Sequence, residues 1–241
     1  PEISETPLYA KGILVVSEGT DNSFGTVSYL DREMAVVENE IFERVNSTSF
    51  EGGVQSVNVF NDKVYVVAND ANKVVQANAE TFLLEGTITG LERPRYYIGI
   101  DDDISFVSEW GADGLTGSVA VVESINLNII DRIATPAGAD KMLQVANKVW
   151  ILCAGGLGRG NKVVLIDIVR GEILNEIELR GSPRSIVRDA NNKVWIACSG
   201  NVGDVNDNEN GALIRFNASS VAIEETLDLG ATVEDLNFDL A

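Results

Sequence analysis

The residues best suited to chemistry in this sequence are cations at recurring positions. Arg95, Lys141 and Arg184 occupy equivalent places in a repeated pattern, where the other copies have Gln55 and Glu234. The chain has only 18 Lys and Arg against 37 Asp and Glu, so cations at these positions are notable. Such groups bind anions through charge-assisted hydrogen bonds, which predicts a site for an anionic or amide-rich ligand. The alternative is that they only neutralise neighbouring carboxylates.

Aromatic residues close to these cations in the sequence extend the candidate site. Tyr96, Tyr97 and Trp110 can offer flat apolar surface, as pockets for large planar ligands do. Trp150 and Trp195 lie at matching positions within expected strands, which predicts packing roles instead. The candidate ligand-binding set is therefore Gln55, Arg95, Tyr96, Trp110, Lys141 and Arg184.

Catalysis finds little support in the residue types. The chain has no histidine, which removes Ser-His-Asp and Cys-His machinery and the usual zinc ligand sets. Cys153 and Cys198 fall at the same point of a repeated phrase, as small buried residues of neighbouring repeats do. We therefore expect no enzyme and no cofactor. A bound Ca²⁺ ion stays open as an alternative, since Asp204, Asn206 and Asn208 have the alternate spacing of Ca²⁺ ligands. The opposing interpretation is that this segment is a flexible polar loop.

The net charge of −19 excludes further classes of function. Nucleic-acid binding requires a basic surface to neutralise phosphates, so it is disfavoured. No apolar run approaches the roughly 18 residues of a membrane-spanning helix.

A repeated phrase reveals how the candidate residues are positioned. "KVWILCAGG" begins at Lys148 and "KVWIACSGN" begins at Lys193, with weaker copies at 11–20, 62–70 and 102–111. Each copy is a short β-branched run between turn residues, which is typical of a strand. A paired-strand element follows each copy, and its anchor residue recurs at intervals of 44 to 50 residues: Val27, Val74, Val119, Val163 and Leu213.

Four short strands in about 45 residues are typical of a propeller blade. The sequence predicts an all-β fold, a single β-propeller domain over 1–241 with four-stranded antiparallel blades. The expected limits are 10–53, 54–93, 94–139, 140–182 and 183–231, with the first strand of a sixth blade at 232–241. A lone strand is costly to expose, so we expect part of a seven-bladed ring. The alternative is a six-bladed ring that residues 1–9 close together with 233–241.

The two ends of the blades differ in their loops. One end carries short generic turns, whereas the other carries long glycine-rich loops at 17–25, 108–117, 154–161 and 199–211. Binding residues are often carried by variable loops on a rigid scaffold, so we expect the binding face at the end with the long loops.

Several segments carry a resemblance to a known family. "GILVVSEGTDNSFGTVSYLD", "VQSVNVFNDKVYVVANDANKVVQANAETF", "TGLERPRYY" and "NKVWILCAGG" resemble bacterial surface propellers with YVTN-type repeats. More narrowly, the chain is similar to secreted or lipid-anchored propellers of Bacteroidetes-type bacteria, some of which capture cobalamin for a TonB-dependent transporter. The resemblance implies seven blades, a place at the outer-membrane surface of a Gram-negative bacterium, and binding rather than chemistry.

Three functions compete at this point. The first is capture of a bulky nutrient such as a corrinoid, held by the candidate set and passed to an outer-membrane transporter. The second is an accessory or scaffolding subunit of an outer-membrane protein complex. The third is a calcium-dependent lactonase, which the absence of a histidine base disfavours.

Overall fold

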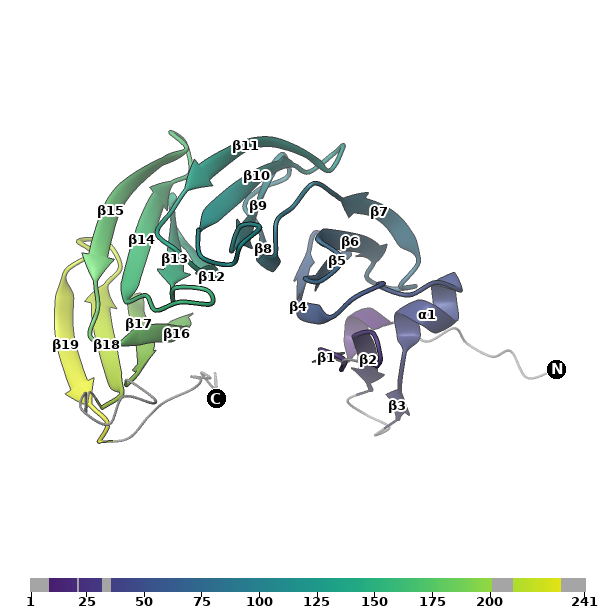
Figure 1. Cartoon of the computed structure of the whole chain (residues 1–241), viewed down its shortest axis with the longest axis horizontal. Coiled ribbons are helices and arrows are strands. Elements are labelled where there is room, and N and C mark those ends of the chain that lie inside the picture. Colours follow the sequence, from purple (N-terminus) through teal and green to yellow (C-terminus); the bar gives the residue numbers. More distant parts are fainter. Residues whose placement is uncertain (1–8, 21, 32–35, 201–209, 231–241) are drawn as a thin grey trace. The chain divides into compact units, whose positions relative to one another are not determined.

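The computed structural model describes residues 9–20, 22–31, 36–200 and 210–230. Within them the chain forms antiparallel sheets in which each strand pairs with the next along the sequence (Figure 1). Four of the sheets have four strands, and the first has three described strands. The predicted all-β fold of four-stranded antiparallel blades is thereby confirmed. The limits predicted for each blade stay predictions, and the strand expected within 232–241 lies outside the described residues.

The strands are short and follow one another with brief connections. The first two sheets contain β1 (Ile13–Ser17), β2 (Thr26–Leu30) and β3 (Val37–Glu38), then β4 (Val54–Phe60), β5 (Lys63–Ala68), β6 (Lys73–Asn78) and β7 (Leu84–Ile88). The third contains β8 (Pro94–Gly99), β9 (Ile104–Glu109), β10 (Ser118–Glu123) and β11 (Asn128–Ala134). The fourth and fifth contain β12 (Ala139–Val145), β13 (Lys148–Cys153), β14 (Lys162–Asp167) and β15 (Glu172–Glu178), then β16 (Ser182–Arg188), β17 (Lys193–Ser199), β18 (Ala212–Asn217) and β19 (Ile223–Asp228).

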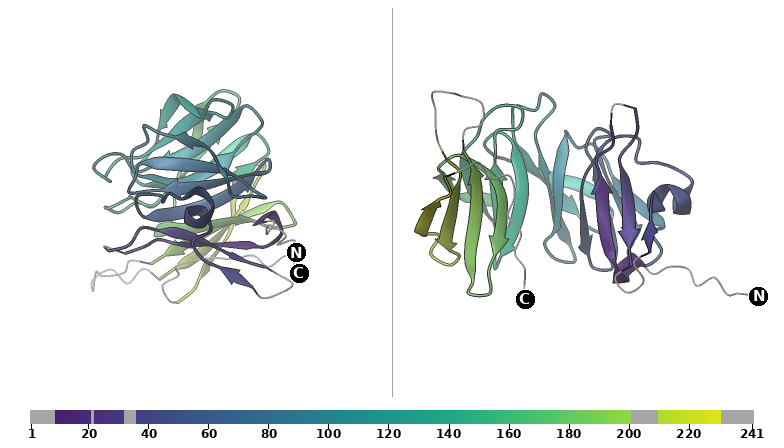
Figure 2. Two further views of the ribbon diagram at one scale, coloured as in Figure 1. Left: turned by 90° about the vertical axis from the view of Figure 1, so that its right-hand side faces the viewer. Right: turned by 90° about the horizontal axis from the view of Figure 1, so that it is seen from below.

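Local sequence explains both the strands and their turns. β5 and β13 are runs rich in β-branched and aromatic residues, which favour the pleated, half-buried surface of a sheet. Asn61 and Asp62 join β4 to β5 with φ angles of 48° and 58°. A two-residue turn with both φ angles positive matches the right-handed twist of hairpin strands, and Asn and Asp tolerate it. Two further views show the twist of the strands (Figure 2).

Two helices interrupt the strand pattern near the N-terminus. η1 (Tyr9–Lys11) is a single 3-10 turn, and α1 (Ile41–Asn46) is a six-residue α-helix. The sequence predicts an all-β fold, so α1 was missed. Six residues make fewer than two turns, which is too short for an apolar period of 3.6 residues to appear. The helix is nonetheless anchored, because Ile41 and Phe42 are buried. Within the described residues, no helix has the length and apolar character needed to cross a bilayer.

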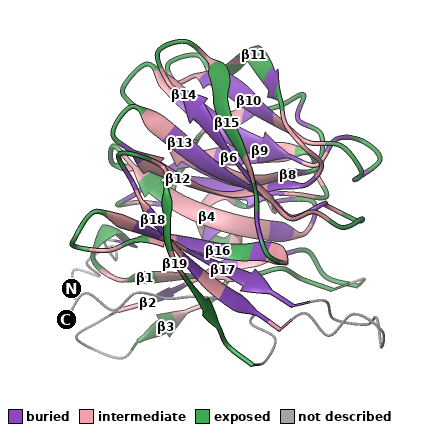
Figure 3. Ribbon diagram, turned by 90° about the vertical axis from the view of Figure 1, so that its left-hand side faces the viewer, coloured by how far each residue is buried: buried purple, intermediate pink, exposed green. Residues whose placement is uncertain are grey.

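The chain divides into two compact units. The first unit is Pro1–Val107 with Ala120–Asp131, and the second is Ser108–Val119 with Arg132–Ala241. In each unit the central strands are buried, whereas the fourth strand of a sheet is largely exposed, as β11, β15 and β19 show (Figure 3). The core of each unit is therefore formed by side chains on the faces of the inner strands.

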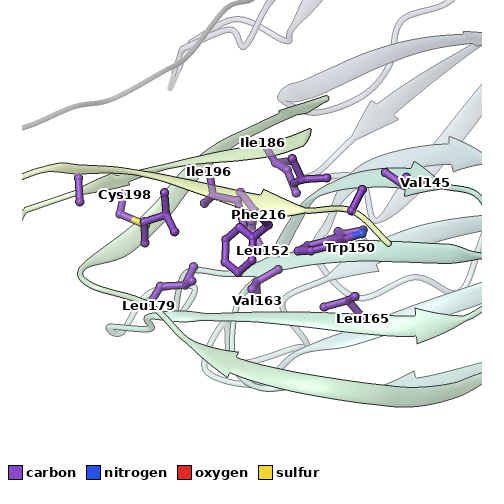
Figure 4. Close-up of a cluster of buried hydrophobic side chains, with 14 residues drawn as sticks. Val145, Trp150, Leu152, Val163, Leu165, Leu179, Ile186, Ile196, Cys198 and Phe216 are labelled. Carbon is purple, nitrogen blue, oxygen red and sulfur yellow. The ribbon is translucent and has the colours of Figure 1, made fainter. Parts of the chain in front are cut away.

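In the second unit, the fourth and fifth sheets share a core. The fully buried Trp150 of β13 meets Phe216 of β18 edge-to-face, with ring centroids 5.3 Å apart (Figure 4). Leu152 and Ile196 fill the same layer. Burying a large apolar side chain contributes roughly 1.5–3 kcal/mol, so this layer holds the two sheets together.

Both cysteines belong to such packing. Cys153 and Cys198 are fully buried free thiols, and burial raises the pKa of each to about 12. A thiol with that pKa is almost wholly protonated near neutral pH and is therefore a poor nucleophile. The predicted role of small buried hydrophobes is confirmed for both residues.

Candidate functional site

An arginine-lined hollow of about 620 Å³ lies at the loop-rich end of the second unit. Its walls come from the β13–β14 loop, from the connection between β15 and β16, and from the first residues of β16. Arg159, Arg180 and Arg184 all line it, and we call it the arginine hollow. Glu178 is the only carboxylate among the described residues of its wall. The volume falls within the range of small-molecule pockets.

Arg184 reaches the hollow from a β-bulge. The pairing of β16 with β17 shifts register between Pro183 and Ser185, so Arg184 is the extra residue. Bulges redirect a side chain without ending the strand, and they are frequent beside binding sites. The guanidinium is also held in place, because its Nε–H donates to Ser199 Oγ at 3.2 Å. The Ser199 hydroxyl in turn donates to the carbonyl of Ser182 at 3.3 Å.

The other two arginines differ in their partners. Arg180 Nη2 donates to Asp228 Oδ2 at 2.8 Å. The pKa of Asp228 is lowered, first by the backbone N–H of Gly230 and then by this guanidinium. Arg159 is exposed and forms no ion pair with any described residue. Guanidinium groups match carboxylate and phosphate in geometry, so the hollow suits an anion that can displace or share the Asp228 contact.

Two loops build the neighbouring wall by packing on each other. The N–H of Leu157 in the β13–β14 loop donates to the carbonyl of Gly114 in the β9–β10 loop at 2.9 Å. A Cβ atom at Gly156 would lie 2.3 Å from the Gly114 oxygen and 3.5 Å from Trp110 Cδ2. Glycine is required at 156 both for this approach and for its φ of +62°. Trp110 therefore backs the loop that walls the hollow.

Glu109 anchors the base of the β9–β10 loop. It is fully buried, and its Oε2 accepts hydrogen bonds from Ser118 Oγ at 2.9 Å and from Arg132 Nε at 3.0 Å. A buried carboxylate needs such partners to offset its lost hydration. The loop that carries Trp110 thus starts from a fixed point.

A second hollow, of about 710 Å³, lies in the first unit. Glu18, Glu51 and Asp70 line it, together with Gln55, and we call it the acidic hollow. Gln55 is also a bulge residue, because β4 shifts register against β5 between Val54 and Ser56. Lys73 Nζ donates to Glu51 Oε2 at 2.6 Å and lowers the pKa of Glu51.

The predicted site residues are distributed over both units. Gln55 lines the acidic hollow and Arg184 the arginine hollow, while Trp110 supports the wall of the latter. Arg95 and Tyr96 are half-buried in β8, and Lys141 is half-buried at a register shift of β12. These last three line neither hollow. A single site that contains all six stays a prediction.

The expectation for Tyr97 is corrected by its packing. Tyr97 is buried and stacks on Tyr65 with ring centroids 3.8 Å apart, and desolvation raises its pKa. Its ring is therefore part of the core and offers no surface to a ligand.

Trp195 was expected to pack in the core, and it is more exposed than that role implies. It is half-buried, with Nε1–H donating to Asp189 Oδ2 at 2.9 Å and Arg215 over its ring.

Arg159 and Arg180 are site residues that the sequence pattern missed. They lie in connections, where the repeat is weakest. The signal available was three arginines on segments that the blade pattern brings to the same end, in a strongly acidic chain.

The possible calcium loop at Asp204, Asn206 and Asn208 lies outside the described residues. Within the described part of the chain, no group of three or more Asp, Glu or Cys residues is arranged to hold a metal ion.

Known structures share the fold. The WD40 domain of Neurospora crassa Pan2 aligns with a TM-score of 0.68 and 8% identity, over 98% of this chain and 70% of that one. A protein of unknown function from Bacteroides caccae gives a TM-score of 0.58 and 11% identity, over 90% and 72%. Kuenenia stuttgartiensis hydrazine synthase gives 0.59 and 16%, over 72% of this chain. The chain spans 46% of the length of that synthase.

At these identities the likeness concerns the fold alone, which is of the β-propeller type. No curated protein shows a significant match to the sequence. One family model, described as "Domain of unknown function (DUF5074)", matches residues 11–230. Because that match covers most of the chain, the protein belongs to the DUF5074 family.

Proposed function

We propose that this protein is a non-catalytic binding protein that holds a bulky anionic ligand at its arginine hollow. The observation that carries the proposal is the convergence of Arg159, Arg180 and Arg184 on one hollow of ligand size. In a chain with a net charge of −19, three cations around one hollow concentrate positive charge at one place on an acidic protein. That positive charge favours anions over every other class of ligand.

The chemistry of the described residues supports binding over catalysis. The chain has no histidine, and both of its thiols are buried with a pKa of about 12. General acid–base or nucleophilic catalysis needs a group whose pKa lies near the working pH. The arginines of the hollow supply charge and hydrogen bonds instead.

The resemblance to YVTN-type surface propellers extends the proposal to a location and a partner. By that resemblance the protein acts at the outer-membrane surface of a Gram-negative bacterium, secreted or lipid-anchored. Its ligand is a nutrient of corrinoid size, which it passes to a TonB-dependent transporter. Calorimetry with cyanocobalamin tests the ligand, and copurification from outer membranes tests the partner. The absence of heat with cyanocobalamin would exclude the corrinoid form of the proposal.

Pyrophosphate is a direct probe of the hollow itself. We expect Arg184→Gln to weaken pyrophosphate binding about tenfold at constant ionic strength, because one charge-assisted contact is lost. Arg188→Gln is the matched control, since Arg188 is an exposed arginine at the opposite end of the same strand. Equal affinity in the wild type and in Arg184→Gln would show that the hollow is not the anion site.

A further inference from the structure

Two exposed leucines lie on the two loops that pack together beside the arginine hollow, although neither leucine lines the hollow itself. Leu115, in the β9–β10 loop, is 56% exposed, and Leu157, in the β13–β14 loop, is 62% exposed. A Cβ atom at Gly158 would lie 3.7 Å from Leu115 Cδ2, so Leu115 borders the residue that follows Leu157. We call this pair the leucine shelf. Single exposed leucines are ordinary, but two from separate loops on one spot form an apolar patch.

The shelf is held in place by backbone hydrogen bonds. Leu157 N–H donates to the Gly114 carbonyl at 2.9 Å, which joins the two loops next to both leucines. Leu115 N–H donates to Asp113 Oδ1 at 2.8 Å, and Gly138 N–H donates to the Thr116 carbonyl at 2.9 Å. An apolar surface that is already ordered binds a ligand with a small loss of conformational entropy.

The shelf and the arginine hollow share one loop. Gly156, Gly158 and Arg159 line the hollow, and Leu157 lies between the two glycines. Glycines at 156 and 158 add no side chain between the leucines and the cavity. A ligand that extends from the guanidinium groups past these glycines can reach the leucine shelf on the same loop.

We infer that the site takes an amphipathic anion, whose acidic group lies among the arginines and whose apolar body lies on the leucine shelf. Charge complementarity assigns the acidic end, and the paired leucines assign the other. The inference rests on the proposed function, because it names the class of ligand for the same hollow. It predicts that neither a compact inorganic anion nor a neutral apolar molecule uses the whole site.

A matched pair of fluorescent probes separates the two halves of the site. 8-Anilinonaphthalene-1-sulfonate carries a sulfonate on an apolar ring system, and N-phenyl-1-naphthylamine is the same molecule without the sulfonate. Pyrophosphate serves as the anion without an apolar body. The variants are Leu115→Ser, Leu157→Ser and Arg184→Gln, with Val169→Ser as the control. Val169 is 84% exposed in the turn after β14, at the opposite end of that sheet.

The inference predicts a specific pattern of affinities. Each leucine variant weakens the sulfonate probe about five- to tenfold and leaves pyrophosphate binding unchanged, because apolar burial alone is lost. Arg184→Gln weakens both anions about tenfold and leaves the neutral probe unchanged. Val169→Ser changes none of them. Urea unfolding of each variant checks that the fold is intact.

Two other results would overturn the inference in distinguishable ways. If the leucine variants bind the sulfonate probe as the wild type does, while Arg184→Gln still loses pyrophosphate, the shelf plays no part and the anion hollow stands. If pyrophosphate binding is insensitive to Arg184→Gln, the proposed function fails, and the inference fails with it.

Discussion

The two hollows occupy equivalent places in the repeat and have opposite charge. Each lies between a loop of one sheet, β1–β2 or β13–β14, and the start of the next sheet, and each has a bulge residue in its wall. Gln55 fills that position in the acidic hollow and Arg184 in the arginine hollow. The backbone thus provides a recess at this point of the blade, while the side chains decide what the recess can bind.

In each hollow, one charged residue of the wall also pairs with a counter-ion from outside the wall. Glu51 and Arg180 stand at equivalent positions before β4 and β16, and they pair with Lys73 and Asp228 respectively. Glu18 and Asp70 remain in the wall of the acidic hollow, where Asp70 accepts a hydrogen bond from the N–H of Gly53. Arg159 and Arg184 remain in the wall of the arginine hollow beside Glu178, which accepts a hydrogen bond from Asn161. The difference teaches that charge here is a property of single loop positions and does not follow the repeat.

The strongest test of this comparison reverses the charge at the bulge. Arg184→Glu should lower pyrophosphate affinity about a hundredfold, because one cation is lost and one anion is added within a few ångströms of the ligand. Arg188→Glu makes the same change of net charge away from the hollow and should have little effect. Titration calorimetry of both variants at constant ionic strength measures the difference, and equal losses would show that only net charge matters.

The next largest effect concerns the wall of the arginine hollow, where the β13–β14 loop packs on the β9–β10 loop. Gly156→Ala should destabilise the protein by about 1–3 kcal/mol more than Gly171→Ala, because its Cβ would meet the Gly114 oxygen. Gly171 has a similar φ of +67° and nothing within 4 Å of its Cβ position, so both variants share the backbone strain. Urea unfolding compares them. Equal stability of the two variants would contradict the close packing of the loops.

A smaller effect follows from removing the counter-ion of the arginine hollow. Asp228→Asn frees Arg180 from its carboxylate partner and should raise pyrophosphate affinity about two- to fivefold. Asn keeps an oxygen that can accept the Gly230 N–H, so the local turn is preserved. The ion pair between Arg215 and Glu225, away from the hollow, offers the control Glu225→Gln, which should leave the affinity unchanged. A loss of affinity in Asp228→Asn would mean that Asp228 positions Arg180 for the ligand.

The smallest effect tests the counter-ion of the acidic hollow. Lys73 lowers the pKa of Glu51, so their ion pair stabilises the fold above the ordinary carboxyl pKa, and this contribution is lost as pH falls through the lowered value. Lys73→Met should return the pKa of Glu51 toward its ordinary range. Lys63→Met is the control, because Lys63 lowers the pKa of Glu85 instead. Carboxyl carbon NMR titration follows both groups, and an unmoved Glu51 would contradict the pairing.

The blade pattern could be predicted from sequence because the same burial recurs in each copy. The matching phrases at Lys148 and Lys193 became equivalent strands, and their cysteines became equivalent buried residues. The tryptophans of those phrases show where the pattern stops. Trp150 pairs across the sheet with Leu165 and is fully buried, whereas Trp195 pairs with Arg215 and is half-buried. One polar partner on the neighbouring strand changes the environment of an identical residue.

Only those residues of the candidate site that lie in strands could be predicted from the sequence. Arg184 and Gln55 could be found because they stand at a fixed point of the repeat. Arg159 and Arg180 lie in connections whose path depends on loop packing, such as the bond between Leu157 and Gly114. No period in the sequence encodes that path. The leucine shelf was missed for the same reason, since it forms only where two loops meet.

The bulge at the start of β4 and β16 has a consequence for how such proteins diversify. It sets one residue apart from the hydrogen-bonded ladder and from the apolar layers, so that residue can change without a cost in packing. A glutamine, an arginine or a lysine can stand there while the rest of the sheet stays as it is. Replacing a single codon at this point in one copy of the repeat is then enough to alter which solutes that copy attracts, and several copies in one chain can vary independently.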